Sequence, residues 1–99
     1  MVKMTLADIK NKLTALKPEL HKRFGVSVIG VFGSWVRGEQ KETSDLDVLV
    51  DFDRDIGLFE IMELEEYLGE IFDCKVDVAV KRSLRKYISQ HILAEVEYL

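Results

Sequence analysis

Two short runs in which Asp alternates with apolar residues constrain this chain more than any other feature. The first is Asp45-Leu46-Asp47-Val48-Leu49-Val50, and the second is Lys75-Val76-Asp77-Val78-Ala79-Val80. Side chains alternate between the two faces of a β-strand, so each run predicts a strand with one buried apolar face and one face that carries Asp. Asp45 and Asp47 then share a face, and we expect Asp77 to join them from a neighbouring strand.

Three carboxylates on neighbouring strands predict a site for divalent cations. Like charges this close repel each other, and a cation between them lets both stay ionised. An all-oxygen set favours Mg²⁺ or Mn²⁺, which bind through carboxylates, waters and substrate phosphates. Three such groups are enough for two ions. The alternatives are that Asp45 and Asp47 are solvent-facing strand residues, or that Asp73 or Asp51 replaces Asp77. However, Asp73 precedes the strand and Asp51 lies beyond the expected reach of the metal.

A Gly-Ser pair follows the first apolar run of the chain. Val26 to Phe32 reads as a buried strand, and Gly33-Ser34 stands where this strand ends and a short helix begins. Glycine lets the backbone approach an anion, and the amides at a helix start point toward it. Ser34 adds a hydroxyl, and Arg37 lies where it can reach a phosphate. Together with the carboxylates, this turn indicates a nucleoside triphosphate site.

Several side chains around this turn and near the end of the chain allow two interpretations. Trp35 either stacks on a base or packs against the protein. Arg37 either binds a phosphate or pairs with Glu39 or Glu42. A basic cluster at the start of the last predicted helix would need an anion to offset the helix dipole, unless it is a solvated turn; its members are Lys81, Arg82, Arg85 and Lys86. His21 and His91 have no ligand-like spacing, so we expect both on the surface.

Length and composition limit the class of protein. A chain of 99 residues predicts one domain over residues 1–99, and its 47% hydrophobic content is ample for a core. A formal charge of −4 argues against general attraction to nucleic acid. Cys74 is the only cysteine, which excludes an internal disulfide and fits a reducing compartment. The N-terminus lacks a signal sequence, and no apolar stretch approaches the roughly 20 residues of a membrane span, so we expect a cytoplasmic protein.

The remaining pattern predicts helices that alternate with three strands. A first helix begins at Thr5 and ends near Lys17, and Pro18 opens a further turn through Arg23. Residues 58–72 form a helix, and Ser83 caps the last helix. The apolar face of the 58–72 helix consists of Leu58, Ile61, Leu64, Leu68 and Ile71. These elements predict a mixed α/β fold in which helices pack on a mainly three-stranded sheet.

On these motifs the chain resembles the minimal nucleotidyltransferases of the DNA polymerase β-like superfamily. The resemblance rests on residues 33–38, 44–50 and 76–78, and more loosely on 92–99. It implies the fold of that superfamily, with Gly33 and Ser34 on the nucleotide phosphates. It also implies that Asp45 and Asp47 bind the metals and that Asp77 completes the acceptor-side metal. Val36 departs from the family pattern, in which alanine is common.

The resemblance also implies an activity and a partner. The expected reaction transfers a nucleoside monophosphate, AMP from ATP, to a hydroxyl on a HEPN-type toxin, so that the chain acts as an antitoxin. The size of the chain leaves no residues for an acceptor-binding domain, which is why a separate protein should supply the acceptor. The alternatives are a non-catalytic antitoxin that masks its partner and a regulatory domain that binds nucleotide without turnover. Self-association is compatible with each of them.

Overall fold

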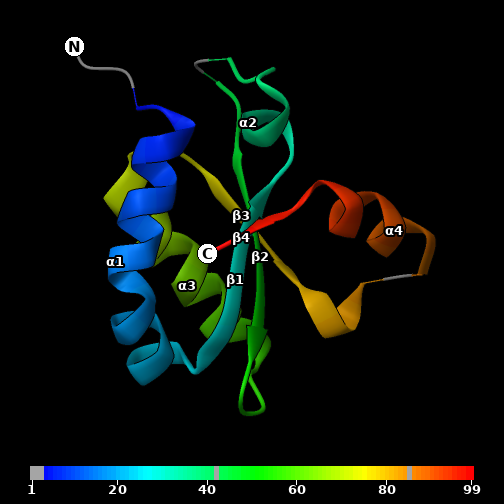
Figure 1. Cartoon of the computed structure of the whole chain (residues 1–99). Coiled ribbons are helices and arrows are strands. Elements are labelled where there is room, and N and C mark those ends of the chain that lie inside the picture. The colour runs from blue at the N-terminus through cyan, green and yellow to red at the C-terminus, as the bar shows by residue number, and fades with distance from the viewer. Residues whose placement is uncertain (1–3, 42, 85) are drawn as a thin grey trace.

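The computed structural model describes residues 4–41, 43–84 and 86–99, and the side chains of residues 86–89 are outside this description (Figure 1). It contains a long helix α1 (Leu6–Phe24), a short helix α2 (Ser34–Arg37), and helices α3 (Leu58–Phe72) and α4 (Lys86–Glu95). The strands are β1 (Val26–Phe32), β2 (Leu46–Phe52), β3 (Val76–Val80) and β4 (Glu97–Tyr98). A 3₁₀ turn, η1 (Lys81–Ser83), follows β3.

The strands form one mixed sheet in the order β3-β2-β1-β4. β2 runs antiparallel to β1 and parallel to β3, and β4 pairs antiparallel with β1 at the edge. The predicted α/β class is confirmed, but the sheet has four strands where the sequence predicted three. β4 has only two residues, which is too short to show an alternating pattern. The segment that leads into β4 can lie close to β1 because position 30 is glycine. A Cβ atom there would lie only 2.6 Å from the Val96 side chain.

Helices lie on both faces of this sheet. α1 and α3 cover one face, and α4 lies on the other (Figure 1). The apolar face of β2 points into the α1/α3 layer, as the alternation predicted. Its side chains Leu46, Val48 and Val50 are fully buried there. The opposite face of β2, which carries Asp47, is therefore turned toward the side of α4.

The first helix is longer than predicted. α1 continues through Pro18 to Phe24 and ends where Gly25 adopts a left-handed conformation, with φ of +79°. The proline removes one backbone donor, but Leu20 and Phe24 beyond it are buried in the core. Packing of the second half thus outweighs the local cost of the proline. The start is as predicted, since Thr5 caps the helix.

Two details of the later helices were also predicted wrongly. Leu58 has 69% of its surface exposed, so it is not part of the buried face of α3, whereas Leu64 and Leu68 are fully buried. Ser83 lies in η1 and does not cap α4, which begins at Lys86. Among the residues that the structure describes, no helix has both the length and the apolar character needed to cross a membrane.

Candidate active site

The three predicted carboxylates meet at one end of β2 and β3. Asp47 and Asp77 are register partners on these parallel strands, and Asp45 immediately precedes β2. Burial, followed by the charges of Asp77 and Asp45, raises the pKa of Asp47 to about 6. Burial and a hydrogen bond with Asp45 also raise the pKa of Asp77. The carboxylates are therefore close enough to oppose one another's ionisation.

A lysine ammonium lies beside two of these carboxylates. Lys75 Nζ is 3.8 Å from Asp45 Oδ2 and 3.9 Å from Asp77 Oδ1. Lys75 stands two residues before Asp77, so both project from the same side of the extended chain. The two-residue spacing of Lys75 and Asp77 in the sequence already indicates that they share a strand face. The protein thus supplies a positive charge of its own at the acidic cluster.

The chemistry of these donors fits a hard divalent cation, although their present arrangement is not that of a loaded site. In the ranges that the structure describes, no three His, Cys, Asp or Glu side chains are placed to hold one ion as they stand. Carboxylate oxygens are nevertheless the ligands that Mg²⁺ takes, and burial together with the charges of Asp77 and Asp45 raises the pKa of Asp47. Metal binding would require ionised Asp47 and some movement of the Lys75 ammonium.

The Gly-Ser turn packs directly against the carboxylates. Gly33 has φ of +82° and accepts hydrogen bonds on its carbonyl from the amides of Val36 and Arg37, at 3.1 and 3.2 Å. A Cβ atom on Gly33 would lie 2.1 Å from Asp47 Oδ2. Glycine is therefore needed here for two reasons, the backbone conformation and the close approach of Asp47.

An acidic residue that the sequence did not predict contacts both the turn and Arg37. The Gly33 amide donates to Glu95 Oε2 at 2.7 Å, and Arg37 Nη1 donates to Glu95 Oε1 at 2.6 Å. Burial would raise the pKa of Glu95, but the hydrogen bonds from Arg37 and Gly33 outweigh it and leave this pKa below its ordinary value. Arg37 also pairs with Glu39 at 2.5 Å, one of the two partners predicted for it, and its contact with a phosphate stays a prediction. Glu95 is 62 residues from Gly33, and no local pattern points to it.

A hollow of about 500 Å³ opens between the turn and α4. Its lining comprises Phe32, Gly33, Arg37, Asp47, His91, Ile92 and Glu95. His91 is exposed, as expected, but it borders this hollow. The hollow thus joins the predicted phosphate donors to one of the predicted metal ligands.

Other predicted side chains have structural roles. Trp35 is half-buried and packs against the core, which confirms the packing alternative. Arg82 donates to Asp51 Oδ1 at 2.7 Å and to the Phe52 carbonyl, so it ties η1 to β2. Lys81 lies over the ring of Tyr98. The predicted basic cluster is thus partly engaged elsewhere; Glu42 and the side chains of Arg85 and Lys86 lie outside the described residues.

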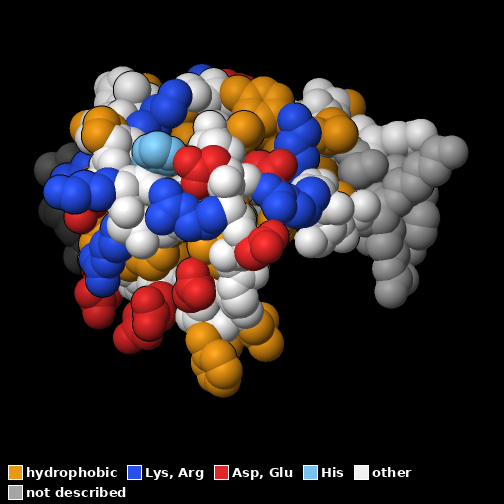
Figure 2. Space-filling model, turned by 90° about the horizontal axis from the view of Figure 1, so that it is seen from below, with side chains coloured by type: hydrophobic (Ala, Val, Ile, Leu, Met, Phe, Trp, Pro, Cys, Tyr) orange, Lys and Arg blue, Asp and Glu red, His pale blue; other side chains and the backbone are white. Residues whose placement is uncertain are grey.

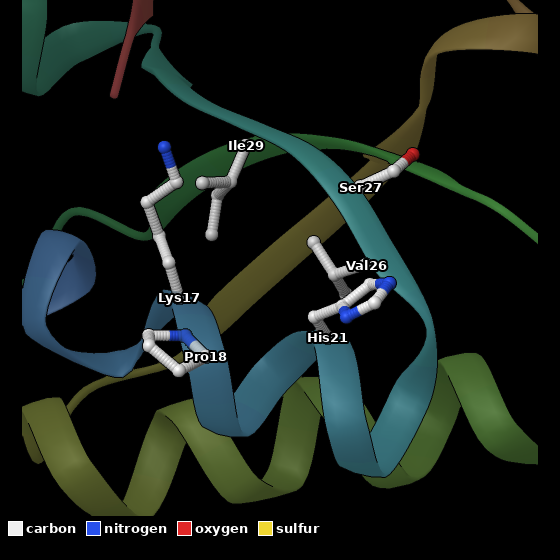
Figure 3. Close-up of a pocket in the computed structure, with 6 residues that line it drawn as sticks. All are labelled: Lys17, Pro18, His21, Val26, Ser27 and Ile29. Carbon is white, nitrogen blue, oxygen red and sulfur yellow. The ribbon is translucent and has the colours of Figure 1, made fainter.

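A second hollow, of about 330 Å³, lies between α1 and β1 (Figure 3). Lys17, Pro18 and His21 line it from the helix, and Val26, Ser27 and Ile29 line it from the strand. Lys17 Nζ donates to the Leu99 carbonyl at 2.7 Å. None of the predicted site residues lines this hollow, so the candidate active site is the one around Asp47.

Comparison with known proteins agrees with this geometry. Residues 13–99 match the model of the nucleotidyltransferase domain family. The chain belongs to the nucleotidyltransferase family. It is 50% identical to the protein adenylyltransferase MntA of Thermococcus cleftensis over 99 residues, which is all of both chains. The family predicted from the sequence motifs is therefore confirmed.

Solved structures support the same assignment for this nucleotidyltransferase. A structure assigned as a minimal nucleotidyltransferase is 31% identical, with all of both chains covered and a TM-score of 0.81. A toxin-antitoxin crystal structure with AMP-PNP is 26% identical, covering 90% of this chain and 70% of that chain, with a TM-score of 0.76.

Proposed function

We propose that residues 1–99 work as one minimal nucleotidyltransferase domain, which transfers AMP from ATP to a hydroxyl of a HEPN-type toxin in the cytoplasm and so acts as its antitoxin. The observation that carries this proposal is the placement of Asp47 and Asp77 as register partners beside the Gly33 turn. The similarity to a protein adenylyltransferase and to a toxin-antitoxin structure with AMP-PNP favours ATP as substrate and a toxin as acceptor.

In this proposal the acidic cluster would hold two Mg²⁺ ions, with Asp45 and Asp47 as ligands and Asp77 as the ligand for the ion that serves the acceptor. When bound, the ions supply charge neutralisation of the triphosphate and a lower pKa of the acceptor hydroxyl. The protein itself contributes position and shape. Asp47 must be ionised for this role, and its pKa of about 6 leaves it mostly ionised at neutral pH.

The phosphate side uses the donors of the Gly-Ser turn. The Gly33 amide, the Ser34 hydroxyl and the Arg37 guanidinium are proposed to bind the phosphates of ATP. The acceptor hydroxyl would lose its proton to solvent and attack the α-phosphorus. The bond between the α-phosphorus and the oxygen that bridges it to the β-phosphate breaks, and pyrophosphate leaves. Arg37 suits this position because a guanidinium can bind two oxygens of one anion.

The test is to incubate the purified chain with ATP, Mg²⁺ and a purified HEPN-type toxin, and to measure the intact mass of that toxin. We expect the mass to increase by one or more AMP groups. The double variant Asp45→Asn with Asp47→Asn should abolish this increase. Asp53→Asn, which removes one exposed carboxylate away from the site, should leave it unchanged.

The masking alternative makes the opposite prediction for the same proteins. If the chain acts by occlusion alone, the complex forms without added AMP, and the double Asn variant still relieves toxicity. That result would replace the transfer mechanism with simple complex formation.

A further inference from the structure

The donors proposed for the nucleotide phosphates already hold an anion. Glu95 places one carboxylate oxygen on the Gly33 amide and the other on Arg37, at 2.7 and 2.6 Å. Its side chain is 21% exposed, and it lines the same hollow as Asp47. A carboxylate that bridges a backbone amide and a guanidinium makes the same kind of charge-assisted hydrogen bonds that phosphate oxygens make.

These contacts occupy the only hydrogen-bond donor of the Gly33 amide and the Nη1 donor of Arg37. A backbone N–H provides a single hydrogen bond, so the Gly33 amide cannot serve Glu95 and a phosphate with full strength together. A phosphate beside an ionised Glu95 would also meet a like charge at close range. Hence the turn can bind a nucleotide fully only after Glu95 has left it.

We propose that Glu95 is an intramolecular competitor for the triphosphate, which occupies the Gly33 amide and Arg37 until a nucleotide displaces it. This inference rests on the proposed function, because it assigns the competitor for the same phosphate site. Such a competitor lowers the affinity of the phosphate site for any incoming anion. An anion that accepts only one or two hydrogen bonds replaces the Glu95 contacts with contacts of similar strength, so its net binding free energy is small. A triphosphate with Mg²⁺ gains further contacts at the carboxylates and can displace Glu95.

The structure indicates where the movement would occur. Glu95 is the last residue of α4, and β4 begins two residues later. β4 is held in place by its pairing with β1, by the Leu99 amide on the Ile29 carbonyl, and by Glu97 on Lys10 at 2.6 Å. Displacement therefore requires rotation of the Glu95 side chain or of the last turn of α4, while the C-terminal strand stays paired.

The test compares binding of α,β-methylene ATP with Mg²⁺ to the wild type and to Glu95→Gln by titration calorimetry. Glutamine keeps the size of the side chain but removes its charge, so we expect about five- to tenfold tighter binding. Glu97→Gln is the matched control, because it removes the same charge two residues away and does not contact the turn. Its affinity should stay within about twofold of the wild type.

A second measurement reports the contact itself. The proton resonance of the Gly33 amide should shift in Glu95→Gln without ligand, and should stay unchanged in Glu97→Gln. An unchanged Gly33 resonance in Glu95→Gln, or equal or weaker nucleotide affinity of that variant, would overturn the competitor role. If the wild type binds the nucleotide and Glu95→Gln binds it no more tightly, only the competitor role is refuted. If neither the wild type nor any variant binds the nucleotide, the proposed phosphate site is refuted as well.

Discussion

At the scale of single residues, the site depends on how closely Gly33 and Asp47 approach each other. A side chain at position 33 would have to displace the Asp47 carboxylate, and it would also be strained by the positive φ. The conformation of the Gly33 turn and the position of the Asp47 carboxylate therefore depend on each other sterically. A change at either residue should disturb both functions.

Gly33→Ala should lose nucleotide affinity and also lower stability, because it adds about 1–3 kcal/mol of backbone strain to the collision with Asp47. Gly38→Ala is the matched control: Gly38 has φ of +73°, but a Cβ atom there would meet nothing within 4 Å. The control should show the loss of stability with normal affinity. Calorimetric titration and thermal unfolding measure the two effects, and a Gly33→Ala variant that binds ATP normally would place the phosphate turn elsewhere.

Asp47 makes the metal-free protein less stable at neutral pH. The unfolded carboxyl has a pKa of about 3.9, whereas burial and the neighbouring carboxylates raise it to about 6 in the fold. Between these values the folded chain retains a proton that the unfolded chain has released. The free energy of unfolding therefore falls as pH rises through this range and stays lower above it.

Asp47→Asn should therefore be more stable than the wild type at pH 7 without Mg²⁺, by about 1 kcal/mol after allowance for solvent screening. The gain should shrink as the pH falls from 6 to 4. Asp51→Asn, on the same strand face, loses its pair with Arg82 and should be no more stable than the wild type. Thermal unfolding at several pH values with EDTA measures this. A gain for Asp47→Asn that is the same at pH 4 and pH 7 would contradict the assigned cause.

At the scale of secondary structure, α1 shows tertiary packing overriding a local signal. Pro18 lacks the N–H that would bond the Thr14 carbonyl, so an isolated peptide of this sequence would favour a break there. The two halves are nevertheless one helix, because Leu13 before the proline and Leu20 after it are both fully buried.

Pro18→Ala should stabilise the protein if α1 is continuous in solution. Alanine restores the missing hydrogen bond and removes the steric conflict, so we expect a gain of about 1–3 kcal/mol. Urea unfolding followed by circular dichroism measures the change. Glu19→Ala is the control, because it keeps the proline and changes the adjacent exposed residue, and it should leave the stability within about 0.5 kcal/mol. A Pro18→Ala variant without gain would favour the predicted end of the first helix near Lys17, with a further turn after Pro18.

At the scale of the whole molecule, positive and negative side chains are mixed. Figure 2 shows Lys and Arg beside Asp and Glu on the end of the molecule where β1 begins and β2 ends. Several of the basic residues are paired in the structure, including Arg54 with Asp53 and Arg82 with Asp51. On this face of the described residues the basic side chains therefore lie among acidic ones, and the chain carries a formal charge of −4, which argues against general attraction to a nucleic-acid backbone.

We therefore expect no saturable binding of random-sequence RNA or DNA at about 0.15 M salt, where screening already weakens exposed charge pairs. Fluorescence anisotropy of a labelled oligonucleotide measures this, with and without Mg²⁺. The nucleotide titration of the same sample serves as the positive control. Saturable, strongly salt-dependent binding would point to a nucleic-acid acceptor in place of a protein.

Local patterns determined the parts of the fold that carry the carboxylates. The alternation around Asp47 and Asp77 depends only on the two-residue period of a strand, and the apolar spacing over residues 58–72 only on the helical turn. Both predictions agree with β2, β3 and α3. The Gly-Ser turn was also predictable, because glycine between a strand and a helix is a local signal.

Only the tertiary structure decided which distant residues complete the site. β4 forms because Gly30 admits it against β1, and α1 continues because its second half is buried. Glu95 meets Gly33 and Arg37 only once α4 has folded back over the sheet, and Trp35 turns toward the core. Each of these outcomes depends on the free energy of contacts between segments far apart in the chain, and no periodicity within a segment encodes it.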